Sequence, residues 1–198
     1  MKTSGSPWKK PKRGRKFLMC KLSDLAGKTV SDLLATAFID PNDIPRDLDQ
    51  LLRGHSIIAT SMDFAEIEDI LSEKVQEWGT ILGAVAVKNN NFGIFYRTGS
   101  TFSRIRFTVA HELAHCCLHS EALENGHVLM RYDGYFQDEE EIRADDFASE
   151  LLMPERLMRA EFNMDIKPRV VDLAKKYIVS LNVMWVRLMR LGLLGAAK

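Results

Sequence analysis

Residues 107–119 have the sequence Phe-Thr-Val-Ala-His-Glu-Leu-Ala-His-Cys-Cys-Leu-His, which contains the pattern His111-Glu112-x-x-His115. Successive residues of an α-helix advance by about 100°, so two histidines four positions apart can share one metal ion. Glu112 then lies beside the two imidazoles, where it could accept a proton from a metal-bound water. The stretch predicts a helix that carries part of a metal site.

The residues around the motif predict that this helix is buried. Apolar or small side chains surround the motif on nearly every side, at Phe107, Val109, Ala110, Leu113, Ala114, Cys117 and Leu118. A buried imidazole or carboxylate without a polar partner costs free energy, and a metal ion would supply that partner. The context therefore favours a metal site over a chance pair of polar histidines.

A catalytic zinc ion normally has three protein ligands plus water, so the motif lacks one ligand. His119 continues the spacing, but eight residues at about 1.5 Å each would place it roughly 12 Å from His111 along one helix. An extended motif with Gly and His three and six residues after the second histidine is excluded, because those positions hold Leu118 and Glu121. We expect the third ligand elsewhere, and His119 at the end of the helix.

Residues 138–152 predict a second helix with an acidic first turn and an inner face at Ala144, Phe147, Ala148, Leu151 and Leu152. Glu139 points away from this face, whereas Glu140 and Glu141 flank it on opposite sides, so periodicity does not choose between them. Asp145 favours Glu141, because one carboxylate could bind the metal while the other orients a ligand imidazole. A solvated acidic helix N-terminus is the alternative interpretation.

Cys20, Cys116 and Cys117 predict no disulfide framework, and an odd number without an export signal is typical of reduced thiols in a cytosol. A thiolate ligand from the pair next to His115 is a further alternative. Small apolar fillers in a buried helix explain both cysteines, and we favour that interpretation.

The first 16 residues contain the basic run Lys9-Lys-Pro-Lys-Arg-Gly-Arg-Lys16, and no acid precedes Asp24. The whole chain holds 27 basic and 27 acidic groups. Seven of the basic groups lie in residues 1–16, so residues 17–198 hold 20 basic and 27 acidic groups, a net charge of −7. We expect residues 1–16 to be a disordered tail that either contacts nucleic acid or only aids solubility. No general basic surface is implied.

The longest apolar run, residues 81–87, is far shorter than the roughly 20 residues of a membrane span. Residues 17–20, which follow the basic start, are too short for the core of a signal peptide. We therefore expect a cytoplasmic protein without membrane contacts.

The remaining segments predict a mainly helical α+β chain with a sheet of about three strands. β-branched or apolar runs predict strands at residues 56–62, 81–87 and 92–96, and the asparagines between the last two are typical of a hairpin. Helical spacing occurs at residues 22–38, with an interruption near Gly27, and at residues 44–52, 64–75 and 170–194.

The last of these segments predicts two helices with roughly the spacing of a helix-turn-helix. Ile178 occupies the turn position where Gly is common, and the second helix would present Leu181, Asn182 and Trp185 at its start. As a set, these side chains are poor material for contacts with base edges or phosphates. We favour a pair that packs or binds a partner over one that reads DNA.

Two motifs together resemble the ImmA/IrrE family of intracellular zinc metallo-endopeptidases. They are Arg106-Phe-Thr-Val-Ala-His-Glu-Leu-Ala-His115 and Glu141-x-x-Ala-x-x-Phe-Ala-x-x-Leu-Leu-Met-Pro154, and the match extends more loosely over residues 30–194. The resemblance implies one Zn²⁺ held by His111, His115 and Glu141, with Glu112 as the catalytic base. The family usually has Asn where this chain has Asp145.

The resemblance also implies a zincin-like domain over residues 17–165 and a packed C-terminal helix pair over residues 166–198, after the tail of residues 1–16. Family members typically cleave helix-turn-helix repressors of stress or mobile-element genes, so a repressor is the substrate that the resemblance predicts. A non-catalytic regulator that binds DNA or a repressor is the alternative.

A zinc peptidase usually has a second electrophile that stabilises the oxyanion. The candidates lie between the two site helices, at His127, Tyr132 and Tyr135.

Overall fold

The structure, a computed structural model, describes residues 20–70, 76–77, 79–88, 91–124, 129–133, 138–164 and 167–194. The basic tail of residues 1–16 lies outside the described residues, as do His127 and Tyr135 among the oxyanion candidates. The predictions made for them therefore stay predictions.

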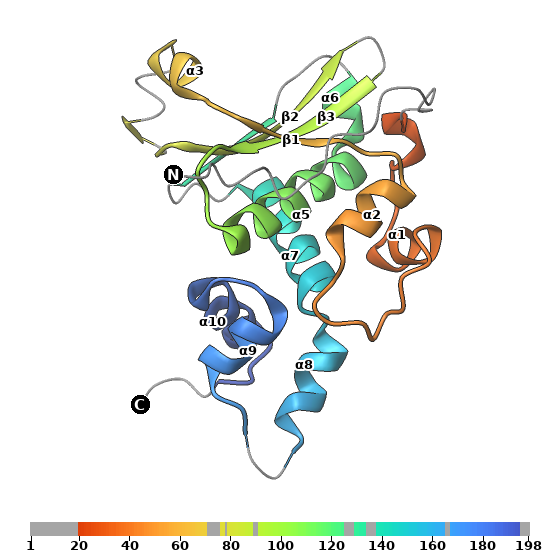
Figure 1. Ribbon diagram of the computed structural model, residues 1–198, viewed down its shortest axis with the longest axis vertical. Helices are drawn as coiled ribbons and strands as arrows, with labels where there is room; N and C mark the ends of the chain where they lie inside the picture. The colour runs from red at the N-terminus through yellow and green to blue at the C-terminus, as the bar shows by residue number, and fades with distance from the viewer. Residues whose placement is uncertain are drawn as a thin grey trace, which may run out of the picture.

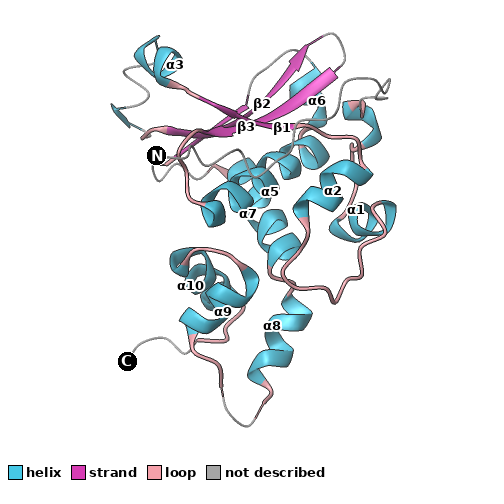
Figure 2. Ribbon diagram, in the orientation of Figure 1, coloured by secondary structure: helices cyan, strands magenta, loops and turns pink. Residues whose placement is uncertain are grey.

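The described residues form an α+β fold, as predicted (Figures 1 and 2). The helical elements are η1 (Leu22–Asp24), α1 (Val30–Thr36), α2 (Leu48–Gly54), α3 (Ala65–Ile70), α5 (Phe102–Leu118), α6 (Ser120–Glu124), α7 (Glu139–Leu152), α8 (Glu155–Phe162), α9 (Val170–Tyr177) and α10 (Leu181–Arg190). The strands are β1 (Ala59–Met62), β2 (Ile81–Lys88), β3 (Asn91–Arg97) and β4 (Leu129–Tyr132).

The strands form one mixed sheet with the order β1-β3-β2-β4. β1 runs parallel to β3, and β2 runs antiparallel to both β3 and β4. The predicted hairpin is the β2–β3 pair, in which Val85 faces Ile94 and Lys88 faces Asn91. The three predicted strands are therefore present.

The fourth strand, β4, corrects the sequence analysis, which treated residues 120–137 as a polar connection. β4 has only four residues and includes Arg131, so it shows little apolar alternation of its own. Its hydrogen-bond partners come from β2, about 45 residues away in sequence, and local patterns do not report such pairing. β4 lies at the edge of the sheet. The same connection also contains the short helix α6, and α8 follows α7 where no element was predicted.

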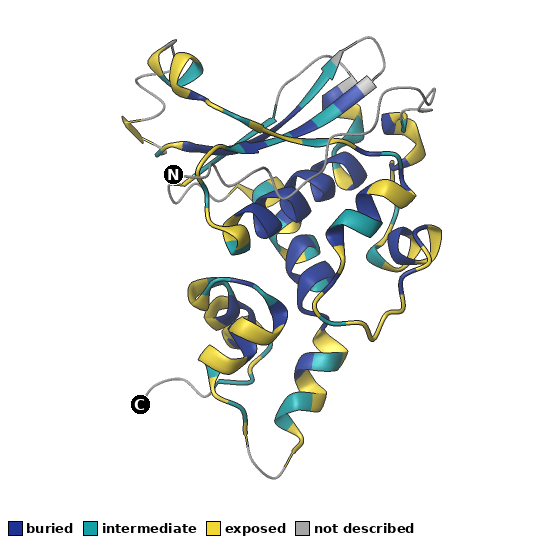
Figure 3. Ribbon diagram, in the orientation of Figure 1, coloured by how far each residue is buried: buried dark blue, intermediate teal, exposed yellow. Residues whose placement is uncertain are grey.

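Helix α5 lies against the sheet and contacts β2, β3 and α7, which places it at the centre of the fold (Figure 1). It begins at Phe102, and Thr101 caps it by accepting a hydrogen bond from the Arg104 N–H. Every residue from Ile105 to Cys117 is buried, as Figure 3 shows. The predicted burial of the motif helix is confirmed.

The C-terminal helices α9 and α10 meet at a tight turn. Ile178 has a left-handed backbone (φ 51°) at the end of α9, and Ser180 caps α10 by accepting a hydrogen bond from the Val183 N–H. Arg187 of α10 donates from Nε to the Met153 carbonyl and pairs with Glu150 of α7. Arg106 of α5 donates from Nε to the Ile178 carbonyl. The helix pair is thus bonded to both site helices.

None of the helices within the described ranges combines the length and the hydropathy that crossing a bilayer requires.

Candidate metal and catalytic site

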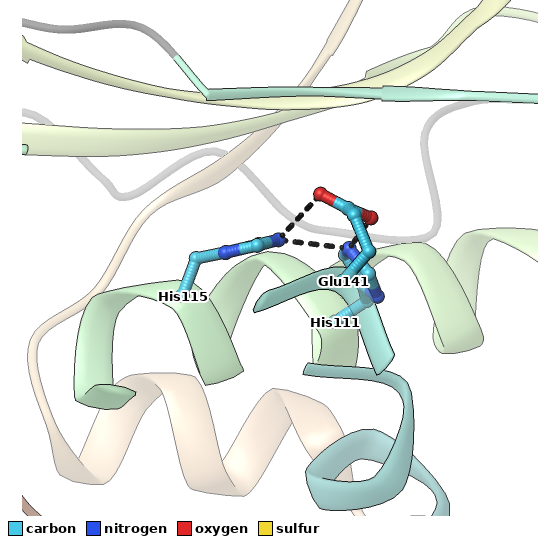
Figure 4. A group of neighbouring side chains, drawn as sticks. All are labelled: His111, His115 and Glu141. Atoms are coloured by element: carbon cyan, nitrogen blue, oxygen red, sulfur yellow. Dashed lines mark hydrogen bonds and ion pairs between the residues drawn. The ribbon is translucent and has the colours of Figure 1, made fainter. Parts of the chain in front are cut away.

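His111 and His115 project from adjacent turns of α5, and their Nε2 atoms lie 3.0 Å apart (Figure 4). Both residues are buried, with 0% and 2% of their surface exposed. Glu141 reaches the same point from α7, where its Oε2 lies 3.1 Å from His111 Nε2 and its Oε1 lies 3.2 Å from His115 Nε2. Glu140, which periodicity left as an alternative, is exposed. The structure therefore brings Glu141 to the histidines.

The geometry of these three side chains fits a metal ion. Ligands about 2.0–2.1 Å from a tetrahedral zinc ion stand roughly 3.3 Å apart. The separations of 3.0 to 3.2 Å between the ring nitrogens and the carboxylate oxygens are close to that value. Burial acts to raise the pKa of Glu141, but hydrogen bonds from His111 and His115 outweigh it and hold the pKa well below its usual range. Glu141 is therefore ionised at neutral pH, as a metal ligand must be.

Each histidine has a partner at its other ring nitrogen. His111 Nδ1 lies 2.8 Å from Asp145 Oδ1, and the Asp145 carboxylate also accepts a hydrogen bond of 2.7 Å from Arg131 Nη1. Burial acts to raise the pKa of Asp145, but the His111 hydrogen bond and the Arg131 charge lower it to about 2. An ionised Asp145 holds the His111 ring with Nε2 turned toward the metal position.

His119 partners the second ligand instead of binding the metal. It caps the end of α5, as predicted, and its Nδ1 lies 2.8 Å from His115 Nδ1. One of these nitrogens must donate and the other accept. Burial lowers the pKa of His119, and the proximity of His115 lowers it further, so a neutral His119 can accept the His115 proton. This bond was not predicted, although the four-residue spacing from His115 was a visible signal.

Replacing Asp145 with asparagine, the residue that the resembled family usually has there, should weaken metal binding by about 10- to 100-fold, as loss of an outer partner typically does. Asparagine keeps an oxygen for His111 but loses the negative charge that makes the imidazole more basic. Titration against a competing chelator measures the affinity. An Asp146→Asn variant, at an exposed neighbour outside the cluster, is the control and should bind metal as the wild type does.

Glu112 is fully buried on α5 between the two ligand histidines in sequence. Neither of its carboxyl oxygens has a hydrogen-bond partner among the described residues. Burial raises its pKa to about 8, while the nearby His115 and Arg131 act in the opposite direction. A buried carboxyl group without a partner is costly, so it is an unusual feature that calls for a chemical role.

Gly83 of β2 provides the space that Glu112 occupies. A Cβ atom at position 83 would lie 2.3 Å from Thr108 Cγ2 and 2.8 Å from Glu112 Oε1, which is closer than real contacts allow. Glycine is therefore required by the close approach of β2 to α5.

The Gly83→Ala substitution should move the Glu112 carboxyl group and lower catalytic turnover by about tenfold or more, because small misplacements of a catalytic group are costly. Metal content should stay close to that of the wild type, since the ligands lie on α5 and α7. Activity and elemental analysis of the same samples measure the two effects. Gly99→Ala, at an open position with positive φ, serves as the control for backbone strain alone. Equal losses in both variants would contradict the assignment.

Tyr132 is the one predicted oxyanion candidate within the described residues. It lies in β4, its hydroxyl is 3.8 Å from Met130 Sδ, and it packs against the small apolar cluster that contains Ile81.

Sequence reasoning missed one cation beside the candidate metal site, Arg131, which pairs with Asp145. Its guanidinium lies 5.1 Å from the centre of the Phe107 ring. The short apolar run Leu129-Met130 before Arg131 was the only local signal of this strand.

The cysteines do not join the cluster. Cys116 and Cys117 are buried, and burial raises the pKa of Cys116 well above its usual range and that of Cys117 to about 12. Without a metal their thiols are therefore protonated at neutral pH. Within the described residues, the groups that converge on one point are His111, His115 and Glu141.

A cavity of about 780 Å³ opens beside the cluster and is lined by Glu141 and Asp145. Five consecutive residues, Leu129 to Asp133, line the same cavity. Side chains of a strand alternate between its two faces, so an uninterrupted run indicates that one edge of β4 borders the cavity, the edge that has no partner strand among the described residues. We call this cavity the groove.

Two imidazoles and a carboxylate that converge beside a partnerless buried carboxyl group define a candidate metallohydrolase site. Residues 87–189, slightly more than half of the chain, match the IrrE N-terminal-like domain family, Peptidase_M78. The chain belongs to this metallopeptidase family, and the resemblance stated from the sequence is confirmed. Comparison with curated proteins and with solved structures gave no match.

Proposed function

We propose that this chain is a zinc-dependent endopeptidase of the ImmA/IrrE type with one zinc ion per chain. Its membership of a metallopeptidase family supports hydrolysis of peptide bonds. The donor set of two imidazoles and one carboxylate supports zinc and leaves a position for water. The observation that carries the proposal is Glu112, because a purely structural zinc site has no use for a buried carboxyl group beside its ligands.

In this proposal His111, His115 and Glu141 hold the ion, which would polarise the scissile carbonyl and lower the pKa of a water toward about 7. Glu112 takes a proton from the water and returns it to the leaving nitrogen. Glu112 must be ionised to accept the first proton, and the positive charge of a bound ion would favour that form, whereas the burial that raises its pKa favours holding the proton before the second transfer. Asp145 and His119 keep the two imidazoles oriented through their Nδ1 atoms.

The open edge of β4 is the proposed site for the substrate backbone. An extended peptide can add to a sheet edge through main-chain hydrogen bonds, which hold it without regard to most side chains. Because β4 borders the groove that Glu141 also lines, a peptide on this edge lies beside the cluster.

The substrate proposed by resemblance is a helix-turn-helix repressor in the cytoplasm, whose cleavage would relieve repression of stress or mobile-element genes. The test is incubation of the zinc-loaded protein with candidate repressors, starting with one encoded beside it, followed by mass spectrometry of the products. Cleavage that stops with chelator and returns with zinc supports the proposal. Intact repressors together with cleavage of other proteins would refute the substrate class only.

A further inference from the structure

Helix α10 borders the same groove as the metal cluster. Asn182, Val183, Val186 and Arg190 of α10 and its capping residue Ser180 line it, together with Leu129 to Tyr132 of β4. Val183 and Val186 are three residues apart, so they share the face of α10 that is turned toward the groove. The second helix of the predicted helix-turn-helix thus presents two valines beside the candidate active site.

This wall is fixed to the site helices. Two ion pairs join α10 to α7, Arg187 with Glu150 and Arg190 with Asp146. Met184 and Leu188 of α10 are fully buried beneath them. The position of α10 relative to Glu141 therefore depends on α7 itself, the helix that carries Glu141.

The charged side chain that α10 contributes to the groove, Arg190, is paired with an aspartate. The arginines that line the groove pair with aspartates, in the pairs Arg104–Asp133, Arg131–Asp145 and Arg190–Asp146. Val183 and Val186 line the same groove, and Val186 has 41% of its surface exposed. A charged side chain placed against them would lose hydration without gaining a partner, whereas an apolar one would lose nothing. The cation that this face of α10 offers to phosphate groups of DNA is Arg190, which is already paired with Asp146.

We propose that α10 is the second wall of the substrate groove and selects an extended segment of a protein that places an apolar side chain against Val183 and Val186. This inference rests on the proposed peptidase function. β4 holds the backbone of the segment, and α10 selects the side chain that points away from the sheet edge. The C-terminal helix pair is then a specificity element of the peptidase.

The test is a charge change at the wall, made in both directions. Val186→Asp and Val186→Lys should shift the cleavage preferences of the zinc-loaded protein, measured by mass spectrometry on a library of random decapeptides. At one position of the peptide near the cleaved bond, Val186→Asp should favour basic residues and Val186→Lys should favour acidic residues. Each preference should be about two- to fivefold, which corresponds to the free energy of a partly exposed ion pair. Preferences at the other positions should stay unchanged.

Met189→Asp and Met189→Lys are matched controls, because Met189 lies on the same helix with 42% of its surface exposed but does not line the groove. They should keep the wild-type preferences. Metal content and circular dichroism verify that each variant folds.

Four outcomes would overturn the proposal. A wild type that cleaves neither the candidate repressors nor any library peptide removes the proposed function and this inference with it, and one that cleaves repressors alone overturns selection of a short extended segment. A wild type that cleaves, with both Val186 variants keeping its preferences, overturns the wall alone. The same holds if Val186→Asp leaves cleavage unchanged but abolishes retention of duplex DNA in a gel shift, because α10 would then read DNA.

Discussion

Replacing Glu112 with glutamine should lower peptide hydrolysis by at least about a hundredfold, the lower part of the range for loss of a general acid–base group. Glutamine has the shape of the protonated carboxyl group but cannot accept the proton of an attacking water. It also suits the buried position, where burial already favours the neutral form of Glu112 and raises its pKa to about 8. Single-turnover cleavage measures the loss in the chemical step.

The same substitution should leave the metal in place, since Glu112 is not among the converging ligand atoms. Elemental analysis of wild type and variant should therefore give equal zinc content. Unchanged cleavage in a zinc-loaded Glu112→Gln protein would contradict the assignment of the base. Loss of zinc in this variant would instead mean that Glu112 is a ligand.

Replacing Glu141 with glutamine should weaken zinc binding by more than about a hundredfold, beyond the range typical for loss of an outer partner. Glutamine keeps one oxygen but loses the negative charge that lies 3.1 and 3.2 Å from the two imidazoles. A hundredfold loss of affinity removes about 2.8 kcal/mol of metal-dependent stabilisation of the folded state. Thermal unfolding with and without added zinc measures this difference.

Glu140→Gln is the control for that experiment, because it makes the same chemical change one residue earlier on the same helix at an exposed position. It should bind zinc and unfold as the wild type does. If the two variants exchanged these properties, the ligand would be Glu140, the alternative that helical periodicity could not exclude.

The motif helix was predictable because its information is local. The spacing of His111 and His115 determines that they share a face, and the apolar residues around them determine that α5 is buried. Pro154, shortly after the end of α7, limits that helix through chemistry that acts within a few residues. These features follow from the sequence before any tertiary contact is known.

The partners of the motif depend on contacts between elements, which periodicity does not contain. Glu140 and Glu141 flank the inner face of α7 by similar angles, and only the packing of α7 on α5 turns Glu141 to the histidines. Arg131 could not be assigned to the site from the sequence, because it lies in β4 and that strand forms by pairing with β2, which is distant in sequence. The role of Gly83 likewise appears only where β2 passes Glu112.

The C-terminal helices show a different limit. Their spacing predicts the turn at Ile178 and the start of α10, and the structure has both. The sequence could not show that α10 lines the same groove as β4, because that position follows from its bonds to α7. A helix-turn-helix pattern predicts two helices and their turn. The function of the pair depends on which surface of the protein the helices face.

X-ray absorption at the zinc edge of the zinc-loaded protein reports the atoms bound to the ion, so it tests whether His111, His115 and Glu141 hold it. We expect a first shell of nitrogen and oxygen at about 2.0–2.1 Å, with the outer-shell pattern of two imidazoles and one zinc per chain. Replacing His111 with alanine should remove one imidazole from that pattern. A sulfur shell at about 2.3 Å, as Cys116 or Cys117 would give, or a protein that binds no zinc, would contradict it.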